Sequence, residues 1–288
     1  MSSEIPKTYI SKEKAEKECG HIKDILKRRR ITEPLKPSSQ DYEEAHQKLE
    51  GNKGKESMDH AIKAEKIQDL FDVVLFDWDG VLYDSMETLA EGVVRVCRDF
   101  GVEIDKKKFL ESYDQPYQEW FEKLGIPAKN KNVDNYLRCL YNDEIKPMLR
   151  SKRPDRLFSD VVDVFKKLKE KGIVLGIVSA ERKEYIQKVL VENEIFDLVD
   201  YIFGDAHNKT DVIKKLWREK SFSPDRVLMV GDLPSDLRDA RKAGIKVAGI
   251  ARQKEDFDRL GSYDPDYLMG DLENSLFELY PYVDKKNE

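Results

Sequence analysis

Hydrophobic and polar residues follow three different patterns along the chain. Residues 1–70 are rich in Lys and Glu and contain no apolar run that would form a buried strand. The apolar run Val73–Phe76 comes next, followed by a segment, 85–150, whose apolar residues recur at helical spacing. Short apolar runs then alternate with amphipathic stretches up to the C-terminus. We therefore expect a helical, partly flexible N-terminal extension, a core made of 71–84 and 151–288, and a helical domain at 85–150.

The alternating part of the chain predicts an α/β core. Apolar runs bounded by polar turns indicate strands, and the periodic stretches between them indicate helices. This order favours a mostly parallel, Rossmann-like sheet with helices on both faces, and the run before residue 77 belongs to the same sheet. The predicted strands are 73–76, 173–178, 201–203, 227–230, 247–250 and 266–269, and the predicted helices are 159–171, 181–193, 210–219, 236–243 and 272–279.

The segment 85–150 predicts only helices. Leu89, Val93 and Val96 lie on one helical face, and Gly101 follows as a helix stop. Aromatic-rich stretches with the same periodicity follow around 109–113, 117–124 and 133–149. We expect an all-helical insertion that follows the first strand of the sheet.

The N-terminal extension, residues 1–70, has the composition of solvated helices rather than of a core. Its apolar residues form only a thin stripe over 12–30, and a Pro- and Ser-rich stretch then breaks the pattern. Two further short helices are predicted at about 41–50 and 58–69. Because such a segment buries little surface alone, we expect it to dock on the core, to bind a protein partner or another copy of the chain, or to be partly disordered.

Composition narrows the choice of partners. The chain has 288 residues, 40% hydrophobic and 38% charged, with a formal net charge of -6, which argues against nucleic acid as a partner. The three cysteines are widely spaced and form no Cys-x-x-Cys pair, which fits a reducing compartment. No run approaches the roughly 18 apolar residues of a membrane span, and the N-terminus is too charged for a secretory signal. We expect a cytoplasmic protein with no membrane segment.

Polar residues suited to one task follow four of the predicted strands. Because the carboxyl ends of parallel strands meet at one edge of a sheet, we expect these residues to lie together, where open α/β proteins bind ligands. Carboxylates can act as nucleophiles or carry protons, and hydroxyl and backbone N–H groups bind anions. The residues are Asp77 and Asp79 after the first strand, Ser179 and Ala180 after another, Lys209 before a helix, and Asp232 and Asp236 after the strand at 227–230.

These stretches resemble the four motifs of the haloacid dehalogenase-like (HAD) superfamily of phosphohydrolases. The matches are DWDGVLYDS at 77–85, IVSA at 177–180, Lys209 in NKTDVIKKL, and VGDLPSDLRDARKAG at 230–244. Their order and spacing are similar to those of members with a helical cap inserted after the first motif, such as phosphoglycolate phosphatases and β-phosphoglucomutases. The resemblance covers roughly residues 71–280, and the four motifs together are highly specific.

The resemblance implies a catalytic role for five of these residues. Asp77 is the expected nucleophile, which forms an aspartyl-phosphate, and Asp79 is the expected proton carrier for the leaving group and the attacking water. Ser179, the Ala180 N–H and Lys209 are expected to bind the phosphate oxygens. Dehalogenases have no acid at the position of Asp79, so its presence favours phosphoryl chemistry.

The resemblance also implies a Mg²⁺ cofactor, which the oxygen-only donors suit. The expected ligands are Asp77, the backbone carbonyl of Asp79, and Asp232. Asp236 is expected to lie behind them and to hold a metal-bound water or Lys209.

Several residues of the insertion are candidates for contacting the leaving group of the substrate. Most aromatic residues at helical spacing belong to a core, which is the competing interpretation. The candidates are Tyr113, Gln115, Tyr117, Trp120 and Arg138. Asp84 and Ser85 are expected only to cap the helix that follows the first motif.

We interpret the chain as a Mg²⁺-dependent phosphohydrolase that acts on a small phosphorylated metabolite. One alternative is a phosphomutase of the sugar-phosphate type, which uses the same groups but protects the aspartyl-phosphate from water. The other is a non-catalytic binding or scaffold protein with the same fold, in which the N-terminal helices recruit a partner. Intact motifs argue against that last alternative.

Overall fold

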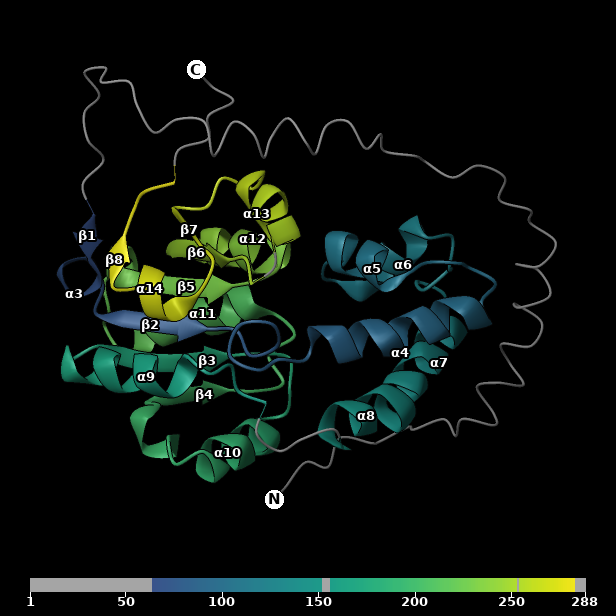
Figure 1. Ribbon diagram of the computed structural model, residues 1–288, viewed down its shortest axis with the longest axis horizontal. Coiled ribbons are helices and arrows are strands. Elements are labelled where there is room, and N and C mark those ends of the chain that lie inside the picture. The colour runs from purple at the N-terminus through teal and green to yellow at the C-terminus, as the bar shows by residue number, and fades with distance from the viewer. Residues whose placement is uncertain (1–63, 152–155, 253, 283–288) are drawn as a thin grey trace, which may run out of the picture.

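The computed structural model describes residues 64–151, 156–252 and 254–282 (Figure 1). Its main sheet has six strands, all parallel, in the order β4–β3–β2–β5–β6–β7. The strands are β2 (Val73–Phe76), β3 (Val174–Val178), β4 (Tyr201–Phe203), β5 (Val227–Gly231), β6 (Lys246–Ile250) and β7 (Tyr267–Met269). The core helices are α9 (Val161–Glu170), α10 (Lys183–Glu192), α11 (Lys209–Glu219), α12 (Pro234–Ala243), α13 (Lys254–Gly261) and α14 (Leu272–Ser275), with 3₁₀ turns at Phe196–Leu198 and Pro224–Arg226. The predicted α/β, Rossmann-like class is confirmed.

Successive residues of β2 pack on opposite faces of the sheet, as the alternation of a strand requires. Val74 and Phe76 join an apolar cluster with side chains of α9, α10 and α14. Val73 and Leu75 join a cluster on the other face, with side chains of α11 and α12. All four side chains are fully buried, so β2 lies at the centre of the core.

The strand order reverses beside β2. The chain places β3 and β4 on one side of β2, and then β5, β6 and β7 on the other. The carboxyl ends of β2 and β5 therefore border the crevice at which doubly wound sheets bind their ligands. The loops that follow β2, β3 and β5 meet at this edge.

The helices of the insertion lie beside that edge and form the unit that we call the cap (Figure 1). They are α4 (Met86–Asp99), α5 (Lys106–Ser112), α6 (Tyr117–Lys123), α7 (Lys131–Leu140), the π-helix Tyr141–Ile145, and α8 (Lys146–Ser151). Their apolar side chains form a separate cluster, which Leu233 of the core joins. Gly101 follows the first helix with a φ of +75°. These helices are consistent with the predicted insertion, and the domain boundaries stay a prediction.

The sequence pattern did not predict one helix, and it predicted a helix where the structure has strand β8. Helix α13 was not predicted because its pattern shows few apolar residues. The predicted helix 272–279 ends at Ser275, since β8 (Glu278–Leu279) instead pairs antiparallel with β1 (Glu65–Lys66). A distant strand supplies the backbone hydrogen bonds there, and local periodicity does not reveal such a partner.

The predicted helix at 58–69 is shorter than expected. Its described part begins with β1, and the helix α3 covers only Ile67–Leu70. The predicted helices at 12–30 and 41–50 lie outside the described residues.

None of the helices in the described ranges is both long and apolar enough to cross a membrane. Cys97 and Cys139 are thiols buried within the cap. Burial raises the pKa of Cys97 to about 12, so its thiol stays protonated and unreactive at neutral pH. The cytoplasmic location stays a prediction.

A buried ion pair joins three parts of the core around the first motif. The guanidinium of Arg252 donates to both carboxylate oxygens of Asp160 at 2.7 and 3.1 Å, and to the Val81 carbonyl at 2.8 Å. Asp160 also accepts a hydrogen bond from the Leu272 N–H (3.0 Å). The loop after β2, the chain returning from the cap and the start of α14 therefore share one charged contact.

We expect Asp160→Ala to lower the free energy of unfolding by about 3–5 kcal/mol, because the change leaves the buried Arg252 without its carboxylate. Asp163→Ala is the matched control on the exposed side of α9, and it should cost less than about 1 kcal/mol. Urea denaturation of both variants measures the difference. Equal losses would show that the buried pair has no special role.

Candidate active site

The first motif begins where β2 ends and turns back within a few residues. The Asp77 N–H donates to the Val230 carbonyl of β5 (3.0 Å), which extends the sheet by one residue. Asp77 Oδ1 in turn accepts a hydrogen bond from the Trp78 N–H (2.7 Å). Trp78 is fully buried and stacks on Tyr83, with ring centroids 5.3 Å apart. These contacts fix the Asp77 carboxylate at the carboxyl edge of the sheet.

Two glycines allow the loops after β2 and β5 to approach each other. Gly80 has a φ of +74°, and a Cβ at this position would lie 2.0 Å from Asp232 Oδ2. A Cβ at Gly231 would lie 2.3 Å from the Cβ of Asp236. Only glycine provides the backbone conformation and the space at Gly80. The acids of the two motifs are therefore neighbours because side chains are absent between them.

Lys209 connects the two motifs through its ammonium group. It is the first residue of α11, where the Asn208 side chain caps the helix by accepting from the Asp211 N–H (3.1 Å). Lys209 Nζ lies 2.8 Å from Asp77 Oδ1 and 2.7 Å from Asp236 Oδ1. Asp236 Oδ2 accepts from the Leu233 N–H (3.1 Å), so Asp236 is held from both sides.

Burial acts oppositely on the acids and the lysine of this cluster. Burial is the largest cause that raises the pKa of Asp77 to about 7, against the attraction of Lys209, and it raises the pKa of Asp232 well above its usual range. Burial alone would lower the pKa of Lys209, but the attraction of Asp236 and Asp77 outweighs it, so that pKa is raised. One charged ammonium thus faces three buried carboxyl groups, which leaves negative charge to be balanced.

The carboxyl cluster has the donors and the unmet need of a divalent-cation site. One oxygen from each of Asp77, Asp232 and Asp236 lies within 4.8 Å of the others. Asp232 Oδ1 is buried and has no hydrogen-bond partner among the described residues, a costly state that a cation would relieve. Both oxygens of Asp236 already accept hydrogen bonds, from Lys209 and the Leu233 N–H, so Asp77 and Asp232 are the better donors. Oxygen-only donors suit Mg²⁺.

The loop after β3 is fixed by its own backbone. The Ser179 N–H donates to the Phe203 carbonyl (2.9 Å), and the Ser179 carbonyl accepts from the Ala206 N–H (2.8 Å). Ser179 Oγ accepts from the Glu181 N–H (3.1 Å), and Ser179 is almost fully buried, whereas Ala180 is exposed. The structure therefore holds this predicted phosphate-binding loop at the same edge of the sheet as Asp77.

Asp79 lies between the core and the cap. Burial raises its pKa to about 6, while a hydrogen bond with Ser85 acts in the opposite direction. The charges of Glu181, Lys209 and Lys146 also act on this carboxyl group. The charges that act on Asp79 thus come from both the core and the cap helix α8.

The helix-capping role expected for Ser85 is wrong, and that of Asp84 stays a prediction. Ser85 is the residue before α4, but its side chain makes no capping hydrogen bond. The Ser85 hydroxyl instead donates to the Tyr83 carbonyl (3.4 Å) and interacts with Asp79. The tight turn of the first motif points this hydroxyl back into the site.

The candidate substrate residues of the cap differ in their surroundings. Tyr113 is buried, its hydroxyl accepts from Gln115 Nε2 (2.8 Å), and burial followed by the charge of Asp79 raises its pKa. Trp120 is buried among cap aromatics and donates to Ser112 Oγ (3.1 Å). Arg138 pairs with Asp134 at 2.9 Å and is half exposed.

Tyr117 also bonds to Asp134, through its hydroxyl. Of the cap candidates, Tyr113 is the one whose ring hydroxyl interacts with both Asp79 and Asp232 in the described structure. The substrate roles of Gln115, Trp120 and Arg138 stay predictions.

Four residues that face the site were not found from the sequence. Burial, followed by the charges of Asp79 and Glu181, raises the pKa of Tyr141 well above its usual range. Lys146 pairs with the buried Glu181 at 3.0 Å. Arg259 donates to the Tyr113 carbonyl (3.0 Å) and to the Asp232 carbonyl (3.2 Å), so it joins the cap to the loop after β5.

The signals for these residues are weak in the sequence. Tyr141 begins a π-helix, a feature that often occurs at functional sites but has no sequence signature here. Arg259 lies on α13, the helix that was not predicted, and Lys146 is one of many cap lysines. The position of Glu181, next to the matched motif IVSA, was the one usable hint.

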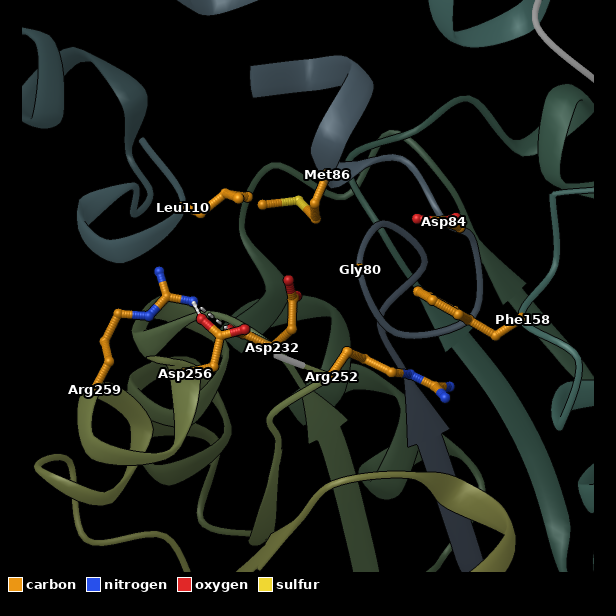
Figure 2. Close-up of a pocket in the computed structure, with 9 residues that line it drawn as sticks. All are labelled: Gly80, Asp84, Met86, Leu110, Phe158, Asp232, Arg252, Asp256 and Arg259. Carbon is orange, nitrogen blue, oxygen red and sulfur yellow. Dashed lines mark hydrogen bonds and ion pairs between the residues drawn. The ribbon is translucent and has the colours of Figure 1, made fainter. Parts of the chain in front are cut away.

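A cavity of about 120 Å³ opens beside Asp232. Figure 2 shows the Asp232 carboxylate directed toward this space, with Arg259 paired to Asp256 at its edge. Gly80 and Met86 line the opposite side, and Leu110 comes from the cap. The carboxyl cluster is therefore reachable from outside between the cap and the core.

The fold is a doubly wound α/β sheet with a cluster of buried acids at the end of its central strand. The chain belongs to the haloacid dehalogenase-like hydrolase family, whose model matches residues 74–250. It is an HAD-like phosphatase.

Curated relatives with similar sequences are phosphatases. Pyrophosphatase PpaX of Bacillus velezensis is 26% identical over 215 residues, which cover 70% of this chain and 94% of the relative. A phosphoglycolate phosphatase of Synechococcus elongatus is 23% identical, over 68% of this chain and 91% of the relative. A haloacid dehalogenase-like family hydrolase from Streptococcus pneumoniae has the same fold, with a TM-score of 0.54 and 24% identity over 69% of this chain and 93% of that chain.

We expect Gly80→Ala to reduce phosphatase activity by about 100-fold, because the new Cβ would occupy the space of the Asp232 carboxylate and force it out of position. Gly101→Ala is the matched control, since Gly101 has the same positive φ but a Cβ there meets nothing within 4 Å. Backbone strain should cost both variants about 1–2 kcal/mol of stability, and Gly80→Ala should lose more because of its clash with Asp232. Activity on an aryl phosphate and thermal unfolding are measured side by side, and equal activity in the two variants would contradict the prediction.

Proposed function

We propose that the protein is a Mg²⁺-dependent phosphohydrolase that acts on a small phosphorylated metabolite through an aspartyl-phosphate at Asp77. The proposal rests on one observation: Lys209 Nζ contacts both Asp77 and Asp236, and it does so beside the unpartnered oxygen of Asp232. A lysine shared by two acids and a carboxylate that lacks a partner together make a site for a phosphate and a cation.

Asp77 is the nucleophile in this proposal. Its Oδ1 accepts from the Trp78 N–H and from Lys209, which orients the carboxylate and leaves Oδ2 to attack phosphorus. Lys209, Ser179 Oγ and the Ala180 N–H bind the equatorial phosphate oxygens, where negative charge must be stabilised.

Asp79 carries the proton of each step. It donates a proton to the leaving-group oxygen and later accepts one from the water that hydrolyses the aspartyl-phosphate. A pKa raised to about 6 by burial suits both tasks, because such a group exchanges its proton near neutral pH. Two carboxylates are needed, since Asp77 is covalently occupied while Asp79 moves protons.

Asp77, Asp232 and the Asp79 carbonyl would hold Mg²⁺, and Asp236 would keep Lys209 in place behind them. The bound cation supplies the positive charge that draws the phosphate toward Asp77 and offsets the excess charge of the acids. The unpartnered Asp232 Oδ1 supports this arrangement.

The substrate class rests on the relatives. They include a pyrophosphatase and a phosphoglycolate phosphatase, and both names describe enzymes that act on small phosphorylated compounds. We place the protein in the cytoplasm, with no nucleic-acid partner. The N-terminal extension is a candidate contact for a protein partner or for self-association.

We expect Asp77→Asn to reduce the release of inorganic phosphate from an aryl phosphate by at least about 10³-fold in the presence of Mg²⁺, because the amide is not a nucleophile. Chelation of the metal in the wild-type protein should abolish the activity in the same assay. Asp99→Asn is the matched control, since Asp99 is an exposed acid at the end of cap helix α4, and it should keep the wild-type rate.

Wild-type protein without metal-dependent phosphate release, or Asp77→Asn with undiminished activity, would contradict the proposal. Incubation with a hexose 1-phosphate separates hydrolysis from transfer. Free inorganic phosphate supports hydrolysis, and an isomerised sugar phosphate would identify a phosphomutase.

A further inference from the structure

The loop that binds phosphate continues into a buried acid that the proposed mechanism does not use. Glu181 follows Ser179 and Ala180 and is 8% exposed. Its Oε1 accepts from the Arg182 N–H (2.7 Å), and its N–H donates to Ser179 Oγ (3.1 Å). The side chain is therefore held rigidly beside the phosphate-binding hydroxyl.

Two cations of cap helix α8 converge on this acid. Lys146 Nζ lies 3.0 Å from Glu181 Oε1, and Arg150 lies 3.4 Å from the same oxygen. The Lys146 side chain is 13% exposed, and the guanidinium of Arg150 also packs over the ring of Tyr185 (4.4 Å). Two positive charges therefore lie beside one buried carboxylate at the end of this loop.

The cluster lies beside the loop that would bind phosphate. The Glu181 N–H donates to Ser179 Oγ, and Lys146 Nζ lies 3.0 Å from Glu181 and 5.7 Å from the centre of the Tyr141 ring. The charges of Glu181 and Lys146 also act on Asp79. In the proposed mechanism Asp79 passes its proton to the leaving-group oxygen, so a leaving group next to Asp79 would lie toward this cluster of the cap.

We propose that Lys146 selects substrates whose leaving group carries its own negative charge, a carboxylate or a second phosphate, and that Glu181 holds Lys146 in position for this contact. The inference rests on the proposed function and adds the chemical class of the leaving group. Lys146 is a specificity-determining residue: it binds the departing group and takes no part in the transfer of the phosphoryl group.

The test compares three substrates in the full-length protein with Mg²⁺. Phosphoglycolate has a carboxylate on its leaving group, pyrophosphate has a second phosphate, and an aryl phosphate has a neutral leaving group. Wild-type protein should show a higher kcat/KM for at least one anionic substrate than for the aryl phosphate. The better of the two anionic substrates identifies which anion the cluster accepts.

Lys146→Met should lower kcat/KM for the preferred anionic substrate by about 10- to 100-fold, because a charge-assisted hydrogen bond is lost. The aryl phosphate should change by less than about 3-fold, since its leaving group makes no such contact. Lys123→Met is the matched control, because Lys123 is an exposed cap lysine. It should leave all three rates unchanged.

A double variant tests whether the loss of activity comes from a loss of the fold. Lys146→Met with Glu181→Gln removes both charges, so no buried carboxylate is left with too few partners. This double variant should lose the same preference for anionic substrates and unfold near the wild-type temperature. Lys146→Arg keeps the charge and should keep part of the preference.

Three results would overturn the inference. Equal losses on anionic and neutral substrates in Lys146→Met would show a structural role, and unchanged rates on the anionic substrates would show no role. A wild-type protein that prefers the aryl phosphate would also exclude it. Absence of metal-dependent hydrolysis of every substrate would overturn the proposed function and this inference together, whereas the first three results leave the proposed function intact.

Discussion

The contact of Lys209 with Asp77 and Asp236 is the interaction on which the rest of the site depends. Three acids gather where the order of a parallel sheet reverses, and in a buried place such acids would protonate rather than stay charged. The ammonium group offsets part of this charge and fixes the positions of two carboxylates. Asp232, which it does not touch, keeps an unpartnered oxygen. Negative charge that Lys209 does not balance therefore remains at this edge of the sheet.

The backbone makes this concentration of charge possible. β2 and β5 are adjacent, so the residues that follow them begin about one strand spacing apart. Gly80 and Gly231 then remove the side chains that would hold the two loops apart. Without these glycines the acids would still follow the same strands but could not share one lysine. The absence of a Cβ atom at these two positions therefore allows the acids to lie close enough to interact.

Much of the core was predictable because its signals are local. The six strands are short apolar runs, and their predicted ends agree with the structure to within about one residue. The residues that gather around Asp77 follow those strands directly. Glu181, Lys146 and Arg259 were not predictable, because each acts through a contact between the cap and the core. Strand β8 was missed for the same reason, since its partner β1 is distant in the sequence, whereas α13 was missed because its sequence has few apolar residues.

The cap is tied to the core on two sides of the site, and each tie reaches a functional group. On one side Asp114 pairs with Arg238 (2.7 Å), and Arg259 joins the Tyr113 carbonyl to the Asp232 carbonyl. On the other side α8 contacts Glu181, next to the phosphate-binding loop. Caps of this kind exclude water from a site when they close. Because the same contacts end on the loops that carry Asp232 and Ser179, the position of the cap is coupled to the positions of these loops.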